Sequence, residues 1–112
     1  MPEITDEMMR QSLAKTRSYT IMLLKAGPNI SMPGVDKIIW EHGRRNFRLR
    51  AAGRLSIICP VADDSGLCGL GIFDADPDEV ERIYAADPGV QAGVFTFEVH
   101  PSRGFPGSCL PG

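Results

Sequence analysis

Residues 76–100 read DPDEVERIYAADPGVQAGVFTFEVH, which places a helix, a tight turn and a strand in succession. Asp76 at the N-cap and Pro77 at the first helical position predict where the helix begins, and Glu79 completes a capping box. The helix must end before Pro88, because the residue preceding a proline is pushed out of the helical region. Apolar and polar residues then alternate to the end of the stretch, which is typical of a strand with one buried face.

The chain upstream supplies one more helix and three more strands. The strands are predicted where apolar runs are bounded by turn residues, over residues 19–25, 55–61 and 67–73. A helix is predicted from Asp36, as its N-cap, to Ala52, and Gly53 ends it. The order from residue 19 is therefore β-α-β-β-α-β, the ferredoxin-like split unit of α+β proteins. Both helices would lie on one face of a four-stranded antiparallel sheet.

The first three strands are apolar on both alternating sets of positions; in the second, Leu55, Ile57 and Cys59 alternate with the equally apolar Ile58. A sheet with one solvated face would instead alternate apolar with polar residues. The second face is therefore expected to be buried, and the chain has no third layer to bury it. We expect a second copy of the chain to cover this face in a homodimer.

Segments at both ends lie outside this unit. Residues 1–18 are interpreted as an N-terminal extension with a short helix after Thr5, residues 19–105 as the α+β domain, and residues 106–112 as a Pro/Gly-rich tail. The N-terminus has no apolar signal-peptide core, and no apolar run approaches the roughly 20 residues of a membrane-spanning helix. We expect a cytoplasmic protein without a membrane partner.

The composition argues against several classes of function. The formal net charge is −2, and the five arginines between residues 44 and 54 would spread around the predicted helix, so we expect no nucleic-acid partner. The three cysteines lack CxxC spacing, and there are only two histidines, so neither a disulfide framework nor a metal site is predicted. The acidic run of residues 74–79 is better explained as helix-capping charge. No cofactor is expected.

The helix predicted over residues 36–52 directs one titratable side chain toward the sheet. At 100° per residue, His42 falls in the middle of the inward apolar stripe. A core histidine bonded to a backbone carbonyl would explain this placement equally well.

The helix that follows Asp76 directs a carboxylate toward the same layer. Val80, Ile83, Tyr84 and Asp87 follow the i, i+3, i+4, i+7 rule. This places Asp87 at a helix C-terminus, where an anion is disfavoured by roughly 0.3–1 kcal/mol, although an Asp-Pro pair is also an ordinary turn start. A carboxylate bonded to one imidazole nitrogen fixes the tautomer and raises the basicity of the other nitrogen, as a general acid/base pair requires.

Three motifs within residues 19–105 resemble the YciI-like (YCII-related) family. His42 is followed eleven residues later by GRL at residues 53–55, which enters a strand. The segment DPGVQAGVF covers residues 87–95, and EVHP ends the next strand at residues 98–101. The sequence departs from the family at the end of the second strand, where the usual Gly-Pro is replaced by Cys-Pro.

The resemblance implies a ferredoxin-like dimeric α+β barrel related to muconolactone isomerase, with His42 and Asp87 as a His–Asp active-site pair. Most family members have no assigned reaction, and one characterised branch eliminates chloride from a chlorinated hydroxyquinol. By this analogy we expect a cofactor-independent lyase or isomerase that acts on a small ring substrate. His42 would move the proton and Asp87 would orient the imidazole.

Further residues are candidates for binding the substrate. Arg45 or Ser56 would hold an anionic or hydroxylated group, although Arg45, at the edge of the inward stripe, is more simply a surface arginine. Cys59, Glu98 and His100 are further candidates for lining the pocket. Two alternatives stay open: a non-catalytic module that binds a small ligand in the same cavity, and a dimer scaffold whose cavity is closed by Cys59 and the tail.

Overall fold

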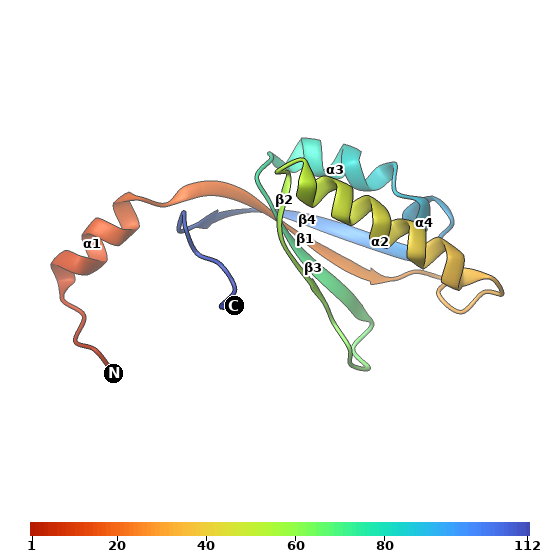
Figure 1. The fold of residues 1–112 in the computed structure, drawn as a ribbon, viewed down its shortest axis with the longest axis horizontal. Helices are drawn as coiled ribbons and strands as arrows, with labels where there is room; N and C mark the ends of the chain where they lie inside the picture. The colour runs from red at the N-terminus through yellow and green to blue at the C-terminus, as the bar shows by residue number, and fades with distance from the viewer.

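The computed structural model describes all 112 residues. In chain order the elements are α1 (Asp6–Ala14), β1 (Arg17–Ala26), α2 (Val35–Ala51), β2 (Leu55–Pro60), β3 (Leu67–Phe73), α3 (Pro77–Ala85), α4 (Pro88–Gln91) and β4 (Phe95–Gly104). Figure 1 shows α2, α3 and α4 together on one face of a single twisted sheet, with α1 apart from them. The predicted α+β class is confirmed.

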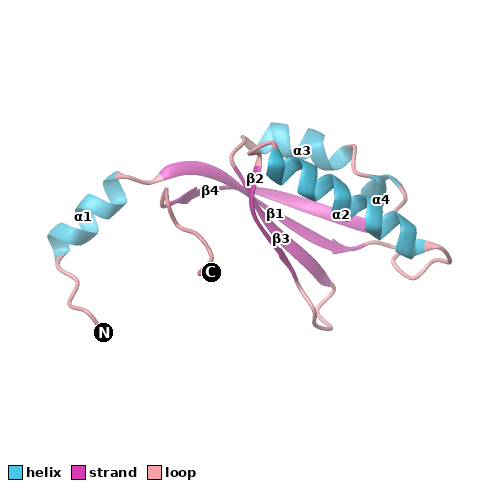
Figure 2. Ribbon diagram, viewed as in Figure 1, coloured by secondary structure: helices cyan, strands magenta, loops and turns pink.

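The strands form one sheet in the order β2-β3-β1-β4, and all three neighbouring pairs are antiparallel. The segment with α2 connects β1 to β2, and the segment with α3 and α4 connects β3 to β4, so both connections pass over the same face (Figure 2). The predicted antiparallel sheet is therefore confirmed, and its topology is compatible with a ferredoxin-like fold. The dimeric barrel stays a prediction.

The core lies between this sheet face and the helices. Strand alternation directs Met22 and Leu24 of β1 inward, while Ile21 and Leu23 point to the open face. The buried apolar residues are Met22, Leu24, Leu55, Phe73, Val80, Tyr84, Val94 and Phe95. The ring of Tyr84 meets that of Phe73 edge-on, with centroids 5.7 Å apart, which fixes α3 against the sheet.

The start of α2 differs from the prediction. Gly34 is the N-cap, in a left-handed conformation with φ 80°, and no side chain caps the helix. The prediction that Asp36 is the N-cap was wrong, because glycine adopts this φ without strain and turns the chain two residues earlier. Asp36 lies in the first turn, where its charge favours the helix dipole. The predicted end is confirmed, since Gly53 has φ 76°.

The cap of α3 is confirmed, but the predicted capping box is only half formed. Oδ1 of Asp76 accepts a hydrogen bond from the Glu79 N–H at 2.8 Å. The Glu79 carboxylate does not reach back to the N-cap and pairs with Arg54 instead, at the entry to β2. This ion pair ties the start of α3 to the connection between α2 and β2.

The two longest strands extend beyond the body of the fold. β4 continues to Gly104, which pairs with Arg17, so the strand runs four residues beyond His100, where the alternating pattern had predicted its end. Pro101 has no N–H to donate, but β4 is an edge strand and tolerates it. The ribbon carries α1 away from the helical layer (Figure 1).

No residue of α1 is buried. Neither α1 nor any other helix is long and apolar enough to cross a membrane.

Removing the caps of α3 and α1 separately should show which helix belongs to the cooperative fold. Asp76→Ala should lower the free energy of unfolding by about 1 kcal/mol, because the Glu79 N–H loses its partner. Thr5→Ala removes an equivalent bond from the Met8 N–H, at 3.2 Å, but α1 packs on nothing, so stability should not change. Urea unfolding followed by circular dichroism measures both. An equal loss in Thr5→Ala would show that α1 is packed in solution.

Candidate active site

A buried hydrogen bond between side chains joins α2 to the segment between α3 and α4. Nδ1 of His42 lies 2.9 Å from Oδ2 of Asp87. The His42 side chain is 8% exposed and that of Asp87 is fully buried. The fold thus brings together the two residues on which the sequence analysis based a site. Their catalytic role stays a prediction.

Asp87 is held by backbone as well as by the imidazole. Its Oδ2 accepts hydrogen bonds from the Gly89 N–H at 2.9 Å and the Val90 N–H at 3.2 Å, so Asp87 is the N-cap of α4. α3 ends earlier, at Ala85. The prediction of an anion at a helix C-terminus was therefore wrong, and Asp87-Pro88 begins a short helix instead of a simple turn. The carboxylate lies where two N–H groups stabilise its charge.

Gly89 is required for this cap. A Cβ at this position would lie 2.6 Å from Cδ2 of Phe95 and 3.1 Å from Oδ2 of Asp87. Without a side chain, the residue 89 backbone passes between the ring and the carboxylate. The DPG motif therefore places the carboxylate against both a backbone donor and the first residue of β4.

Arg45 faces the second oxygen of the carboxylate. Its Nη1 lies 3.8 Å from Oδ1 of Asp87, and neither atom has a hydrogen-bond partner although both are buried. The side chain is 25% exposed, so the simpler interpretation of Arg45 as a surface arginine was wrong. Arg45 does not line the cavity described below, and its charge instead compensates that of Asp87.

The other imidazole nitrogen belongs to a side-chain network that the sequence analysis missed. Nε2 of His42 lies 3.2 Å from Nδ2 of Asn46, and Oδ1 of Asn46 accepts a hydrogen bond from the Tyr84 hydroxyl at 2.9 Å. Because an ionised carboxylate only accepts hydrogen bonds, Nδ1 donates to Asp87 and Nε2 accepts from Asn46. This pattern fits the neutral imidazole. Asn46 lies four residues after His42 on the same face of α2, and this spacing was the signal available in the sequence.

Tyr84 ends this network as a hydrogen-bond donor. Burial raises the pKa of its phenol well above its usual range, and the negative charge of Asp87 raises it further, with Arg45 acting in the opposite direction. The hydroxyl therefore keeps its proton wherever the protein is folded.

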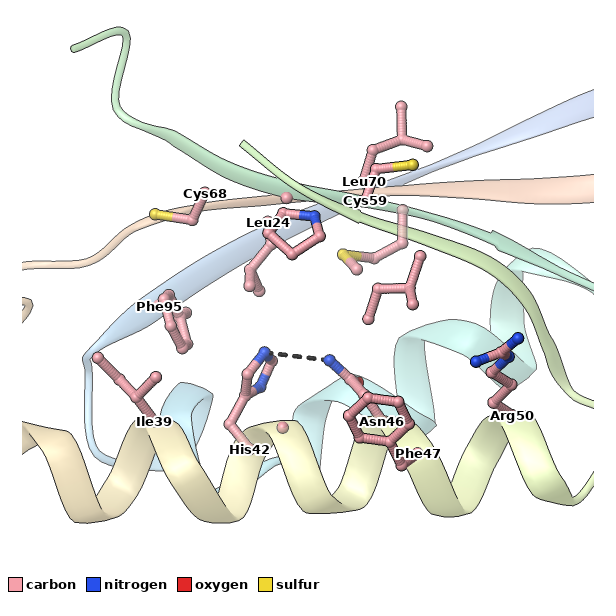
Figure 3. Close-up of a pocket in the computed structure, with 15 residues that line it drawn as sticks. Leu24, Ile39, His42, Asn46, Phe47, Arg50, Cys59, Cys68, Leu70 and Phe95 are labelled. Carbon is pink, nitrogen blue, oxygen red and sulfur yellow. Dashed lines mark hydrogen bonds between the residues drawn. The ribbon is translucent and has the colours of Figure 1, made fainter. Parts of the chain in front are cut away.

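The imidazole lines a cavity of about 500 Å³ between α2 and the sheet (Figure 3). Met22 and Leu24 of β1 and Ile58 of β2 form part of its apolar wall. The Phe95 ring also lines it and contacts the imidazole, with centroids 4.7 Å apart. Small-molecule sites in proteins commonly have volumes of about 300–1,000 Å³ and such mostly apolar walls. The cavity is therefore large enough for a small ring compound.

Cys59 borders this cavity, but its thiol does not fill it. Figure 3 shows the Cys59 side chain beside that of Leu70, on the side of the strands away from α2. No residue of the tail, 106–112, lines the cavity. In the single chain, therefore, neither Cys59 nor the tail closes the cavity, and a closed cavity in a dimer stays a prediction.

The remaining predicted binding residues lie apart from His42. Ser56 is exposed in β2 and does not line the cavity. Glu98 and His100 lie on the open face of the sheet, since Phe95 and Phe97 of the same strand face the helices. A role for these residues beside a partner copy stays a prediction.

Glu98 has partners on that open face. Its Oε1 lies 3.2 Å from Nζ of Lys25 and 3.6 Å from Nε2 of His100. The hydrogen bond from Lys25 holds the pKa of Glu98 below its usual range, and His100 contributes in the same direction.

The side chains that commonly bind metal ions do not cluster in this structure. No group of three or more His, Cys, Asp or Glu side chains is arranged to hold a metal ion. All three cysteines are free, and burial raises the pKa of the Cys68 thiol, which makes its thiolate less available.

Comparison with known proteins assigns no family or function to this chain. No model of a known protein family matches the sequence, and no curated protein matches it. The fold and site define an α+β protein with a buried His–Asp pair beside an apolar cavity.

The contribution of the Tyr84 hydroxyl can be measured by deleting it. Tyr84→Phe should lower the free energy of unfolding by about 1–3 kcal/mol, because Oδ1 of Asn46 is left buried without its donor. Tyr19→Phe is the matched control, since no hydrogen bond to the Tyr19 hydroxyl is found and its loss should cost little. Chemical denaturation compares the two.

The raised pKa of Tyr84 also sets a pH dependence. A folded-state pKa above the unfolded value of about 10 means that the stability is fully present below that pH and is lost as the pH rises above it. In Tyr84→Phe this alkaline loss should be smaller than in the parent. Equal alkaline losses in the two proteins would show that the phenol is not buried as described.

Proposed function

We propose that this chain is a YciI-like enzyme of the lyase or isomerase type, which moves a proton of a small ring substrate with His42. The supporting observation is the 2.9 Å contact between Nδ1 of His42 and the fully buried Asp87, with the imidazole at the wall of the cavity. Asp87 orients the ring and stabilises the imidazolium that forms when Nε2 takes a proton. Fold similarity alone would not specify this chemistry.

The Asn46 amide lets Nε2 change its protonation state. Before the reaction the amide donates to Nε2 through its Nδ2 group. The amide gives up this bond as the substrate proton reaches Nε2. Rotation of the amide then presents Oδ1 as an acceptor for the new N–H, and the Tyr84 hydroxyl accepts from Nδ2. The imidazole and the amide keep a partner in both states, whereas the hydroxyl hydrogen of Tyr84 loses its acceptor in the second.

Two outcomes follow from this proton transfer. In an isomerisation, the electron pair left on the substrate moves along the ring, and His42 returns the proton to another carbon. In an elimination, the electron pair of the broken C–H bond forms a double bond and expels a leaving group such as chloride with its own electron pair, and His42 then releases the proton to solvent. Neither outcome needs a cofactor.

The second part of the proposal is a homodimer through the open sheet face. The helices cover only one side of the sheet (Figure 1). The other side has a row of half-buried apolar residues on neighbouring strands, in which Ile72 pairs with Ile57 and Ile21, and Leu70 pairs with Leu23. An apolar sheet face of this kind is usually covered. The same face of a second copy matches it in shape and polarity.

A specific observation favours one alternative, a non-catalytic module that binds a ligand in the same cavity. Both imidazole nitrogens of His42 already have protein partners, Asp87 and Asn46, so His42 is satisfied as a structural residue. In that case the His42→Ala variant would still bind the ligand, and neither the parent nor the variant would convert it to a product.

The coupling of His42 to Asp87 can be tested by NMR titration. Asp87→Asn keeps an N-cap of equal quality but removes the negative charge, so His42 should become neutral at a pH more than about one unit lower than in the parent. His100 is the internal control, since its carboxylate partner is Glu98 and should not be affected. Identical titration of His42 in both proteins would rule out the acid/base pair.

Turnover is tested with chlorinated and hydroxylated ring compounds, followed by NMR for new products and by chloride release. His42→Ala should lower kcat by a factor of about 10²–10⁴, and Arg48→Ala, on the same helix but exposed and outside the cavity, should retain activity. A compound that binds the parent and His42→Ala equally, and is turned over by neither, would favour the binding module.

The dimer is tested by sedimentation of the parent chain and a variant of the open face. The parent should sediment at twice the chain mass, and Leu23→Asp should give monomers, because a carboxylate cannot be buried there without a partner. Ser56→Asp is the control, since Ser56 is exposed within β2 and the change should be neutral. A monomeric parent at high protein concentration would exclude this interface.

A further inference from the structure

One cationic side chain of the cavity, that of Arg50, makes no contact with the His–Asp pair. Arg50 lies near the C-terminal end of α2, lines the cavity and is exposed to solvent. Its neighbours Arg44, Arg45 and Arg54 each have a carboxylate within 4 Å, at Glu41, Asp87 and Glu79, whereas Arg50 forms no ion pair. Its guanidinium is therefore free to bind a ligand.

The cavity as a whole suits a negative charge. Its polar side chains are His42, Asn46 and Arg50, and no carboxylate lines it. Asp87 lies behind the imidazole, and Arg45 faces its second oxygen. An anion that enters the cavity thus meets a guanidinium and no repelling charge. Guanidinium binds carboxylates through two parallel hydrogen bonds.

The spacing of these groups defines the length of the ligand. Arg50 and His42 are eight residues apart on one helix, which corresponds to about 12 Å along its axis. Figure 3 shows Asn46 and Phe47 between them, with Arg50 at the far end of the row from His42. The flexible arginine side chain covers part of this distance. A ligand that touches both ends must still be elongated.

The wall between the two ends is apolar. Ile58 and Met22 lie on the sheet side, and Phe47 lies on the helix side, where its ring is 66% exposed at the edge of the cavity. Such a wall favours a flat hydrocarbon ring over a sugar or a phosphate ester.

We propose that the cavity binds an elongated ring carboxylate, with its acid group held by Arg50 and the opposite end of its ring beside His42. The position of the reacting atom rests on the proposed function, whereas the Arg50 contact does not. The anion-binding group that the sequence analysis sought at Arg45 is thus assigned to Arg50, five residues further along the helix and on its cavity face.

The test compares three probes by titration of the labelled protein, observed by NMR: 2-naphthoate, its neutral counterpart 2-naphthalenemethanol, and the shorter benzoate. In the parent, 2-naphthoate should bind about tenfold more tightly than either of the others, equivalent to about 1.4 kcal/mol. Added salt should weaken the binding of 2-naphthoate and leave that of the alcohol unchanged, because only the acid interacts through charge.

Two variants assign the effect to one side chain. Arg50→Gln should weaken 2-naphthoate about tenfold and leave the alcohol unchanged. Arg48→Gln is the matched control, since Arg48 is an exposed arginine of the same helix that does not line the cavity, and it should change neither affinity. Equal binding of acid and alcohol, no binding of 2-naphthoate at millimolar concentration, or equal losses in the two variants would each overturn the proposal.

These measurements also separate this inference from the proposed function. Binding of 2-naphthoate needs no turnover. If its affinity depends on Arg50 also in Asp87→Asn, and the titration shows no coupling between His42 and Asp87, the protein would be a carboxylate-binding module. Coupling of the pair without dependence on Arg50 would retain the acid/base proposal and overturn this one.

Discussion

A carboxylate removed from water costs several kcal/mol unless its charge and lone pairs are compensated, and Asp87 is fully buried. Its Oδ2 accepts hydrogen bonds from the His42 imidazole and from the N–H groups of Gly89 and Val90, while Oδ1 faces Arg45. These partners come from α2 and α4, so the carboxylate fixes the helices relative to each other. Loss of any one partner leaves part of the charge uncompensated, which is why the local geometry is so closely specified.

The cavity depends on the same constraint. α2 is held at its middle by His42 and Asn46, through Asp87 and Tyr84, and at its end by the Arg54–Glu79 ion pair nearby. Below it, the helix-facing position 69 of β3 is a glycine that lines the cavity without a side chain. Polar anchors thus position α2 where apolar packing alone would favour closing the gap. The cavity persists because buried hydrogen bonds specify the helix position.

Local signals in the sequence predicted the four strands, the two long helices that cover them, and the His–Asp pair of the site. Asp76 marked the start of α3, and helical periodicity directed His42 and Asp87 inward. Periodicity gives the face of a side chain but not its tertiary partner, so the contact of Tyr84 with Asn46 and the turn of Arg45 toward Asp87 were not predictable. The start of α2 and the end of β4 were missed for a related reason. A left-handed glycine and an edge-strand proline can each be read as a turn until the neighbouring strand is known.

The network around His42 differs from that of a purely structural histidine. A core histidine bonded to a backbone carbonyl has one partner with a fixed role, and protonation of the second nitrogen would leave a buried charge unsolvated. Here the amide of Asn46 can present either its nitrogen or its oxygen, and the Tyr84 hydroxyl can donate or accept. Asp87 already supplies the counter-charge for an imidazolium. In the proposed acid/base cycle, Asn46 thus supplies an acceptor and Asp87 a counter-charge for the imidazolium, while the hydroxyl hydrogen of Tyr84 gives up its acceptor.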